Sequence, residues 1–206
     1  DDGSTDGTLD RLSEIQDPRL RTHRQVNHGA AAARNQGLRM AGGEYIQYLD
    51  ADDLLAPDKI ERQMRLLESL PAGYVASCGW GKFVSGPLEA AFRSQAVWGD
   101  FDAVDWLVCA WEGGGMMQTT CWLVPRAVAE NAGPWDESLS LHDDGEYFCR
   151  ALLASKGIRY CDEAKVYYRT GLEGSLSRRR SREAIESALA VCESYERHTL
   201  CREDSP

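Results

Sequence analysis

Apolar and polar positions along the chain follow two different periods, which divide it into helices and strands. Leu9, Leu12 and Ile15 recur at helical spacing, whereas the segment from Leu20 to Val26 has the length of a short strand. The elements predicted for the first half are a helix over 8–16, a strand over 20–26, a helix over about 30–40, a strand over 45–49, a helix opened by Pro57 and a strand over 74–80.

Two helices carry an apolar stripe that predicts which face they bury. In the helix after Pro57, the stripe consists of Ile60, Met64 and Leu67. The last helix is predicted over 181 to about 197, and its stripe is expected to pack on the same domain or, alternatively, on a second subunit. The residues of this second stripe are Ile185, Ala188, Leu189, Cys192 and Tyr195.

The second half continues the same alternation more loosely. Its predicted elements are a helix near 101–111, a glycine triplet at 113–115, a strand over 119–124, a short helix over 126–131 and a helix entered at about 143. Strands separated by helices are typical of βα units. The pattern therefore predicts an α/β fold with a mixed, mainly parallel sheet flanked by helices.

Composition narrows the class of protein. The 206 residues include 43% hydrophobic residues, enough for a sizeable core, and 23 basic against 33 acidic residues give a net charge of −10. This balance disfavours nucleic-acid binding, which needs a basic face. No long apolar span or leader segment is visible. The seven cysteines form no CxxC pair and indicate reduced core thiols in a cytoplasmic protein.

An acidic cluster follows the predicted strand over 45–49. Asp50, Asp52 and Asp53 lie within four positions, and carboxylates so close together repel one another unless a cation lies between them. Ligands of open α/β sheets gather at the carboxyl ends of strands, where this cluster falls. The cluster therefore predicts a divalent cation site, and the alternative is a solvated polar turn.

A second acidic cluster opens the helix at 143. Asp143, Asp144 and Glu146 fall in its first turn, where helix capping explains one acid but not three.

Two further features of the sequence each allow two interpretations. The basic run at 178–180 either closes on a diphosphate or forms a solvated helix start. Three tryptophans either stack on a sugar or pack in the core, namely Trp106, Trp111 and Trp135.

Five blocks of the sequence, in this order, resemble the family 2 glycosyltransferases. They are the opening Asp-Asp-Gly-Ser-Thr-Asp-Gly-Thr at 1–8, the Asn-x-Gly block through Ala33-Arg34-Asn35 at 27–38, the stretch from Gly43 through Asp50-Ala51-Asp52-Asp53 to Pro57, the acidic pair Asp143-Asp144 with Arg150, and Tyr168-Arg169 followed by Ser-Leu-Ser at 175–177. The family pattern begins earlier, with a first strand and helix that this sequence lacks.

The resemblance implies a GT-A fold, Rossmann-like and binding a nucleotide-sugar, over 1–177. Residues 1–86 would form the nucleotide-binding half, 87–177 the acceptor-side half and 178–206 a C-terminal helical extension. The reaction implied is inverting transfer of a sugar from a nucleotide-diphosphate sugar to the hydroxyl of a glycan, lipid or small molecule. The location implied is the cytoplasm, or the inner face of the membrane if the protein associates with it peripherally. Formation of an oligomer through the C-terminal helix is a further possibility.

The resemblance also implies a role for individual residues. Asp1 or Asp2 would accept a hydrogen bond from the nucleobase, and Arg34 would lie near the nucleoside or brace the acidic loop, against the alternative of an ordinary ion pair. Asp50 would contact ribose or metal-bound water. Asp52 would ligate Mn²⁺ or Mg²⁺, and Asp144 would be the catalytic base. Possible accessory residues are Asp53, Asp143 and Arg178.

Two rival interpretations belong to other classes of protein. One is a truncated or degenerate module that binds a nucleotide or glycan without turnover, which the absent first strand favours. The other is a calcium-dependent structural domain. This second rival is disfavoured because the glycine and glutamate of an EF-hand do not follow Asp50 at the required offsets.

Overall fold

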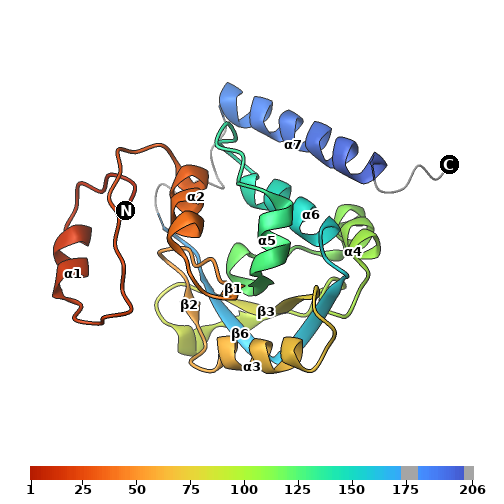
Figure 1. The fold of residues 1–206 in the computed structure, drawn as a ribbon, viewed down its shortest axis with the longest axis horizontal. Coiled ribbons are helices and arrows are strands. Elements are labelled where there is room, and N and C mark those ends of the chain that lie inside the picture. The colour runs from red at the N-terminus through yellow and green to blue at the C-terminus, as the bar shows by residue number, and fades with distance from the viewer. Residues whose placement is uncertain (173–180, 202–206) are drawn as a thin grey trace.

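A computed structural model describes residues 1–172 and 181–201, in which helices and strands alternate (Figure 1). The helices are α1 (Thr8–Glu14), α2 (Ala30–Met40), α3 (Lys59–Glu68), α4 (Ala103–Cys109), α5 (Arg126–Ala132), α6 (Asp143–Leu153) and α7 (Arg182–Leu200). The strands are β1 (Tyr45–Ile46), β2 (Leu54–Leu55), β3 (Val75–Phe83), β4 (Ala91–Phe92), β5 (Val124–Pro125) and β6 (Ile158–Arg169). A wider helical turn, η2 (Ala110–Gly114), extends α4, and a 3₁₀ turn, η3 (Thr119–Cys121), precedes β5.

The main sheet has the strand order β2-β6-β3-β4, and β1 pairs with β5 separately. Its longest pair, β3 with β6, is parallel and runs from Val75 opposite Ile158 to Phe83 opposite Arg169. The shorter pairs of β2 with β6 and β3 with β4 are antiparallel. The α/β prediction with a mixed sheet is therefore confirmed.

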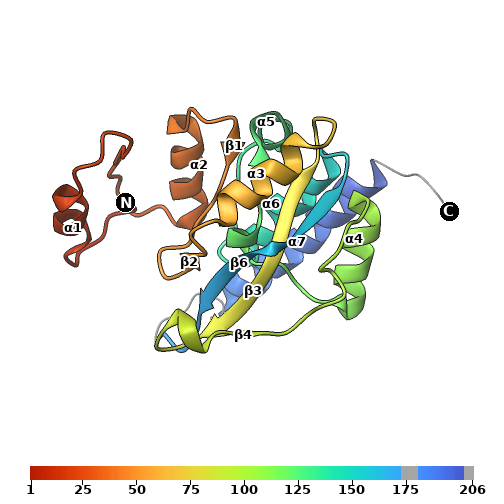
Figure 2. The ribbon, with the colours of Figure 1, turned by 90° about the horizontal axis from the view of Figure 1, so that it is seen from below.

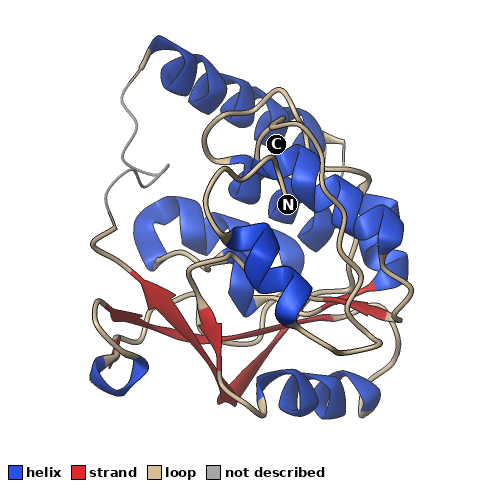
Figure 3. Ribbon diagram, turned by 90° about the vertical axis from the view of Figure 1, so that its left-hand side faces the viewer, coloured by secondary structure: helices blue, strands red, loops and turns tan. Residues whose placement is uncertain are grey.

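Helices cover both faces of the sheet. Helix α3 lies on one face, whereas α2, α5 and α6 lie on the other, with α7 as an outer layer beyond α6 (Figures 1 and 2). The side view in Figure 3 shows the same layers edge-on. The largest core side chains between the sheet and the upper helices include Trp122, Trp135 and Tyr147, all at most 1% exposed. This core fixes the positions of the loops that leave β1 and enter α6.

Three of the predicted strands differ from the structure. Residues 20–26 form no strand, because residues 21–26 make main-chain hydrogen bonds only with Asp1 in the described part of the chain. The strand predicted over 45–49 is limited to β1, since its partner β5 is only two residues long. The strand predicted over 119–124 begins as η3 and pairs at Val124–Pro125, apart from a single bridge between Leu123 and Ala76.

The buried face of α3 differs from the prediction only in part, because Leu67 is buried and Met64 partly buried as predicted. Lys59, Gln63 and Leu67 are the buried residues, whereas Ile60 is 38% exposed. The Gln63 amide donates to the carbonyl of Cys121, and the Lys59 ammonium contacts Gln47 Oε1 and the carbonyl of Trp122. The polar side chains face inward because they satisfy the carbonyl groups of Cys121 and Trp122, which pair with no strand in the described part of the chain.

Lys59 makes the stability of the protein vary with pH in the alkaline range. Burial lowers the pKa of Lys59 to about 8 from 10.5. The unfolded chain therefore holds this proton more tightly, so stability rises as pH increases from about 8 to 10.5. Across that window, we expect the free energy of unfolding of the wild type to rise by about 3 kcal/mol relative to that of Lys59→Met. Urea unfolding at several pH values measures this difference. If the free energies of unfolding of the two proteins changed in parallel with pH, the lowered pKa of Lys59 would be contradicted.

All seven cysteines are free thiols, but they are not all core residues as predicted. Cys192 and Cys201 are exposed on and after α7, whereas Cys78, Cys121, Cys149 and Cys161 are buried. Over residues 1–172 and 181–201, no helix combines the length and apolar character needed to cross a bilayer. The cytoplasmic location stays a prediction.

Candidate functional site

One arginine links the two acidic clusters. Arg34, in the middle of α2, donates from Nη2 to Asp50 Oδ1 at 2.9 Å and from Nη1 to Asp143 Oδ2 at 2.7 Å. Burial opposes its charge, but the carboxylates of Asp50 and Asp143 raise the pKa of Arg34. The turn after β1 and the start of α6 are thereby held on either side of one guanidinium.

Two stacked aromatic rings pack against the guanidinium of this arginine. The Arg34 guanidinium carbon lies 4.5 Å from the centroid of the Trp135 ring, and Trp135 in turn stacks on Tyr147 at 4.2 Å with an interplanar angle of 5°. Asn35 fixes the position of Trp135, because its side chain accepts from the Trp135 amide and donates to the Trp135 carbonyl. The stack therefore restricts the arginine to the side of α2 that faces both clusters.

The three acids after β1 have three different surroundings. Asp50 is half-buried and bonded to Arg34, whereas Asp52 is exposed, and no group in residues 1–172 and 181–201 donates to its carboxylate. Asp53 is 5% exposed and accepts from the Arg169 amide and from the Thr120 hydroxyl. Burial raises the pKa of Asp53 to about 6 despite these two hydrogen bonds. Asp53 therefore anchors the acidic turn to β6, and Asp52 remains available to a ligand.

The three acids of α6 also divide. Asp143 pairs with Arg34, and Glu146 is 3% exposed and pairs with Arg150, from whose Nη2 it accepts at 2.6 Å. Burial raises the pKa of Asp143, an effect that the charge of Arg34 opposes. Asp144 is half-buried and accepts from the Gly145 amide at 2.8 Å, with no other donor in the described residues. Capping alone does not explain this turn, because two of its acids have partners outside the helix end.

The N-terminal acids hold the chain that leads into α2. Asp2 accepts from the amides of His28 and Gly29 and from the Gln25 side chain. Although burial opposes the effect, these hydrogen bonds lower the pKa of Asp2. The Asp1 side chain is 1% exposed, with Arg24 Nε 3.7 Å from its Oδ2. Both acids thus have structural contacts, and nucleobase contact stays a prediction for each.

The donor atoms at this site fit a cation that arrives with a diphosphate. No three metal-ligating side chains of residues 1–172 and 181–201 converge as a preformed site. Mg²⁺ usually takes one or two protein carboxylates together with substrate phosphates, rather than a complete protein cage. The exposed carboxylate of Asp52, to which no group of the described residues donates, provides one such ligand and fits this type of binding.

Several contacts near the site were not predicted from the sequence, although Arg150 and Arg169 belong to the family-like blocks. Thr120 and Arg169 position Asp53, and Arg169 also donates from Nε to the carbonyl of Asp52. No sequence signal identifies Thr120, because it lies 67 positions from its partner. The pairing of Glu146 with Arg150 was detectable, since the two residues are four apart on one helix.

The tryptophans and the C-terminal basic run have different outcomes. Trp106 is 7% and Trp135 1% exposed, so both pack in the core, whereas Trp111 is 47% exposed. The predicted accessory residue Arg178, and the serines at 175 and 177, lie outside the described residues.

Comparison with known proteins gives this arrangement a context. The profile of Glycosyl transferase family 2 matches residues 1–129. One relative is the Escherichia coli UDP-Glc:alpha-D-GlcNAc-diphosphoundecaprenol beta-1,3-glucosyltransferase WfaP. The two sequences are 28% identical over 191 residues, and this alignment covers 91% of this chain and 70% of WfaP. An uncharacterized glycosyltransferase of Rickettsia felis is 49% identical over 70 residues, which are 33% of this chain and 12% of that protein.

A solved structure shows the same fold. The chain superposes with a TM-score of 0.78 on residues 1–349 of S. aureus TarS, whose crystal structure contains UDP-GlcNAc. The identity is 16%, and the match covers 100% of this chain but 57% of the TarS chain. The chain thus spans only part of the length of TarS and of the Rickettsia relative.

The fold is the GT-A fold expected from the sequence, and the matched profile is that of a glycosyltransferase family. The chain belongs to Glycosyl transferase family 2.

Proposed function

We propose that this chain carries the active site of a metal-dependent, inverting glycosyltransferase, with Asp144 as the catalytic base. The main support is the contact of Arg34 with both Asp50 and Asp143. This contact holds the turn that contains Asp52 close to the turn that contains Asp144. A site with a metal-binding carboxylate on one side and a basic carboxylate on the other suits transfer between a diphosphate donor and a hydroxyl acceptor.

Residues 1–86 bind the donor in this proposal. Asp1 or Asp2 accepts a hydrogen bond from the nucleobase, and Asp50 together with Arg34 lies beside the ribose. Asp52 holds Mn²⁺ or Mg²⁺, and the cation, when bound, neutralises charge on the departing diphosphate. UDP-sugars are the first donors to test, because the TarS crystals contain UDP-GlcNAc and the name of WfaP specifies UDP-Glc.

Residues 87–177 receive the acceptor. Asp144 removes the proton of an acceptor hydroxyl while the hydroxyl oxygen forms a bond to the anomeric carbon of the sugar. The bond from that carbon to the diphosphate breaks, and its electron pair leaves with the nucleoside diphosphate. The acceptor approaches from the face opposite the leaving group, so the anomeric configuration inverts. The carboxylate of Asp144 is half-buried and, among the described residues, accepts from the Gly145 amide alone, which suits this role.

The stereochemical outcome provides a direct test. With an α-linked UDP-sugar as donor, we expect a β-linked product, because a single displacement inverts the anomeric carbon. The linkage is read from the anomeric proton coupling in the NMR spectrum of the product, with undecaprenyl-diphosphate GlcNAc as the first acceptor, after the name of WfaP. An α-linked product would contradict the single displacement.

Metal dependence is tested in the same assay. Turnover is expected to stop with EDTA and to return with Mn²⁺ or Mg²⁺. If UDP-sugars stabilise the protein against heat but no donor is turned over, the non-catalytic binding module becomes the better description.

A further inference from the structure

The loop that leads to Asp144 contains an unusual backbone conformation. His142, directly before α6, has φ +60°, and it is the only non-glycine residue with positive φ in the described part of the chain. A left-handed histidine costs free energy, so contacts from elsewhere must hold it in place. Arg34 holds Asp143 on one side of the loop. The contacts on the other side come from α7.

The face that α7 buries consists of small residues and differs in part from the predicted stripe, of which Tyr195 does pack against the core. Its buried residues are Ala184, Ser187, Val191 and Ser194, whereas Ile185 is 65% and Leu189 60% exposed. A helix packed for hydrophobic burial alone would turn these two large side chains inward. The orientation of α7 is instead the one in which its serines meet polar groups of the loop.

Ser187 satisfies three backbone groups of the loop with one hydroxyl. Its Oγ accepts from the amides of Ser140 and Leu141, each at 3.1 Å, and donates to the Leu141 carbonyl at 2.7 Å. These groups lie immediately before His142. Because Ser187 is 5% exposed and its hydroxyl makes three hydrogen bonds to the loop, it fixes the path of the loop.

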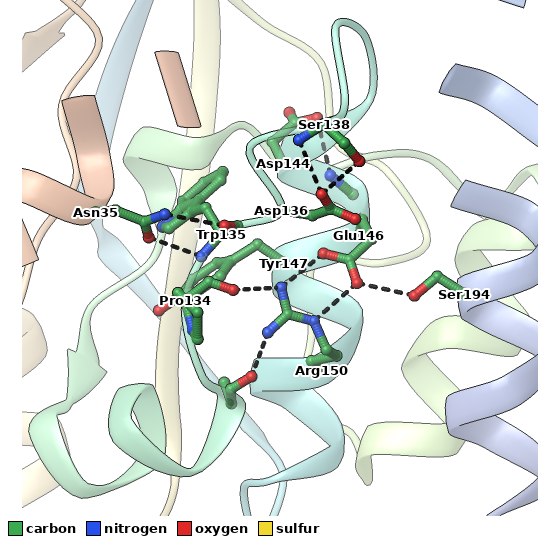
Figure 4. A network of polar contacts seen from close by, with 12 residues as sticks. Asn35, Pro134, Trp135, Asp136, Ser138, Asp144, Glu146, Tyr147, Arg150 and Ser194 are labelled. Atoms are coloured by element: carbon green, nitrogen blue, oxygen red, sulfur yellow. Dashed lines mark hydrogen bonds and ion pairs between the residues drawn. The ribbon is translucent and has the colours of Figure 1, made fainter. Parts of the chain in front are cut away.

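Ser194 and Tyr195 hold the other side of Asp144. Ser194 Oγ donates to Glu146 Oε1 at 2.8 Å, and Glu146 is itself bound by Arg150, which donates to the carbonyls of Ala132 and Pro134 (Figure 4). The Tyr195 hydroxyl lies against Gly145, so close that a Cβ built there would be 2.4 Å from it. Residues on both sides of Asp144 are thus fixed by α7.

We infer that α7 positions the base, and that Ser187 is a positioning residue for Asp144. The inference rests on the proposed role of Asp144. Ser187 does not contact substrate in this view. It holds the loop at Ser140 and Leu141 so that the Asp144 carboxylate reaches the acceptor hydroxyl in the correct orientation.

The test compares Ser187→Ala with variants that separate positioning from stability. Ser187→Ala is expected to lower kcat by about 10- to 100-fold, because small displacements of a catalytic group cost this much. Calorimetric binding of UDP-GlcNAc with Mn²⁺ should remain unchanged. Ser187→Thr keeps the hydroxyl and should restore most of the turnover. The matched control is Val191→Ala, which weakens packing on the same face of α7 but removes no hydrogen bond from the loop.

Hydrogen exchange gives a second, activity-independent readout. Amides of residues 140–146 should exchange faster in Ser187→Ala than in wild type and in Val191→Ala. The inference is overturned if exchange there is unchanged, or if Val191→Ala lowers kcat as much as Ser187→Ala. If exchange rises but donor binding falls and kcat does not, α7 supports the donor side rather than the base. A wild-type protein without turnover contradicts the proposed function instead, and the exchange result still decides whether Ser187 fixes the loop.

Discussion

Replacing Asp144 by asparagine is expected to lower turnover by about two to four powers of ten, because the amide no longer accepts the acceptor proton. Metal and donor binding should remain close to wild type, since Asp144 acts on the acceptor side. The measurement is kcat for sugar transfer together with calorimetric binding of UDP-GlcNAc and Mn²⁺. A folded Asp144→Asn variant with full activity would remove Asp144 as the base.

Asp143→Asn is the matched control for this substitution. It should lower kcat less, because Asp143 contacts Arg34 and not the acceptor in our proposal. Its main effect should be on stability, since it leaves the charge of Arg34 with one carboxylate fewer. If instead both variants lose only about 0.5–2 kcal/mol of stability and keep their activity, the acids of this turn act as helix caps.

Replacing Asp52 by asparagine should abolish metal-dependent donor binding. The substitution keeps the shape of the side chain but removes a charged oxygen ligand. Folding should change little, because Asp52 is exposed and no described group donates to its carboxylate in the structure. Titration calorimetry of UDP-GlcNAc with and without Mn²⁺ measures the effect, and Asp162→Asn, which changes an exposed aspartate on β6, is the control. Unchanged metal-dependent binding by the Asp52 variant would contradict its role as a ligand.

Elements determined by local sequence were predictable. The alanine-rich α2 and the acidic start of α6 appear where their patterns indicate, because helix formation depends on residues three and four apart. The strand predicted over 20–26 was wrong for the opposite reason. A strand needs a neighbouring strand, and a segment of strand length does not by itself reveal whether one is present.

Helix faces were less predictable than helices. In α3 and α7, the apolar stripe suggested one face, but the protein buries Lys59 and Gln63 in the first and Ser187 and Ser194 in the second. In both helices, the inward side chains bond to backbone or carboxylate groups of segments distant in sequence. Such partners become visible only when the chain is folded.

The candidate site shows the same division. The acidic clusters were recognisable because each is contiguous, and an ion pair of Arg34 was one of its predicted alternatives. That a single arginine bonds both clusters depends on residues 109 positions apart, which no local pattern encodes. Nucleobase contact by Asp1 or Asp2 stays a prediction, as does the role of Arg178.

The parallel pair of β3 and β6 has a consequence for how the protein folds. Val75 pairs with Ile158, so the longest strand pair of the sheet closes the loop formed by residues 75–158. Contacts between such distant segments form slowly, because the entropy of loop closure must be overcome first. Asp53, which bonds to the Arg169 amide at the end of β6, is fixed only when this pair has formed. We therefore expect the acidic turn after β1 to become ordered late in folding, in the same step that pairs β3 with β6.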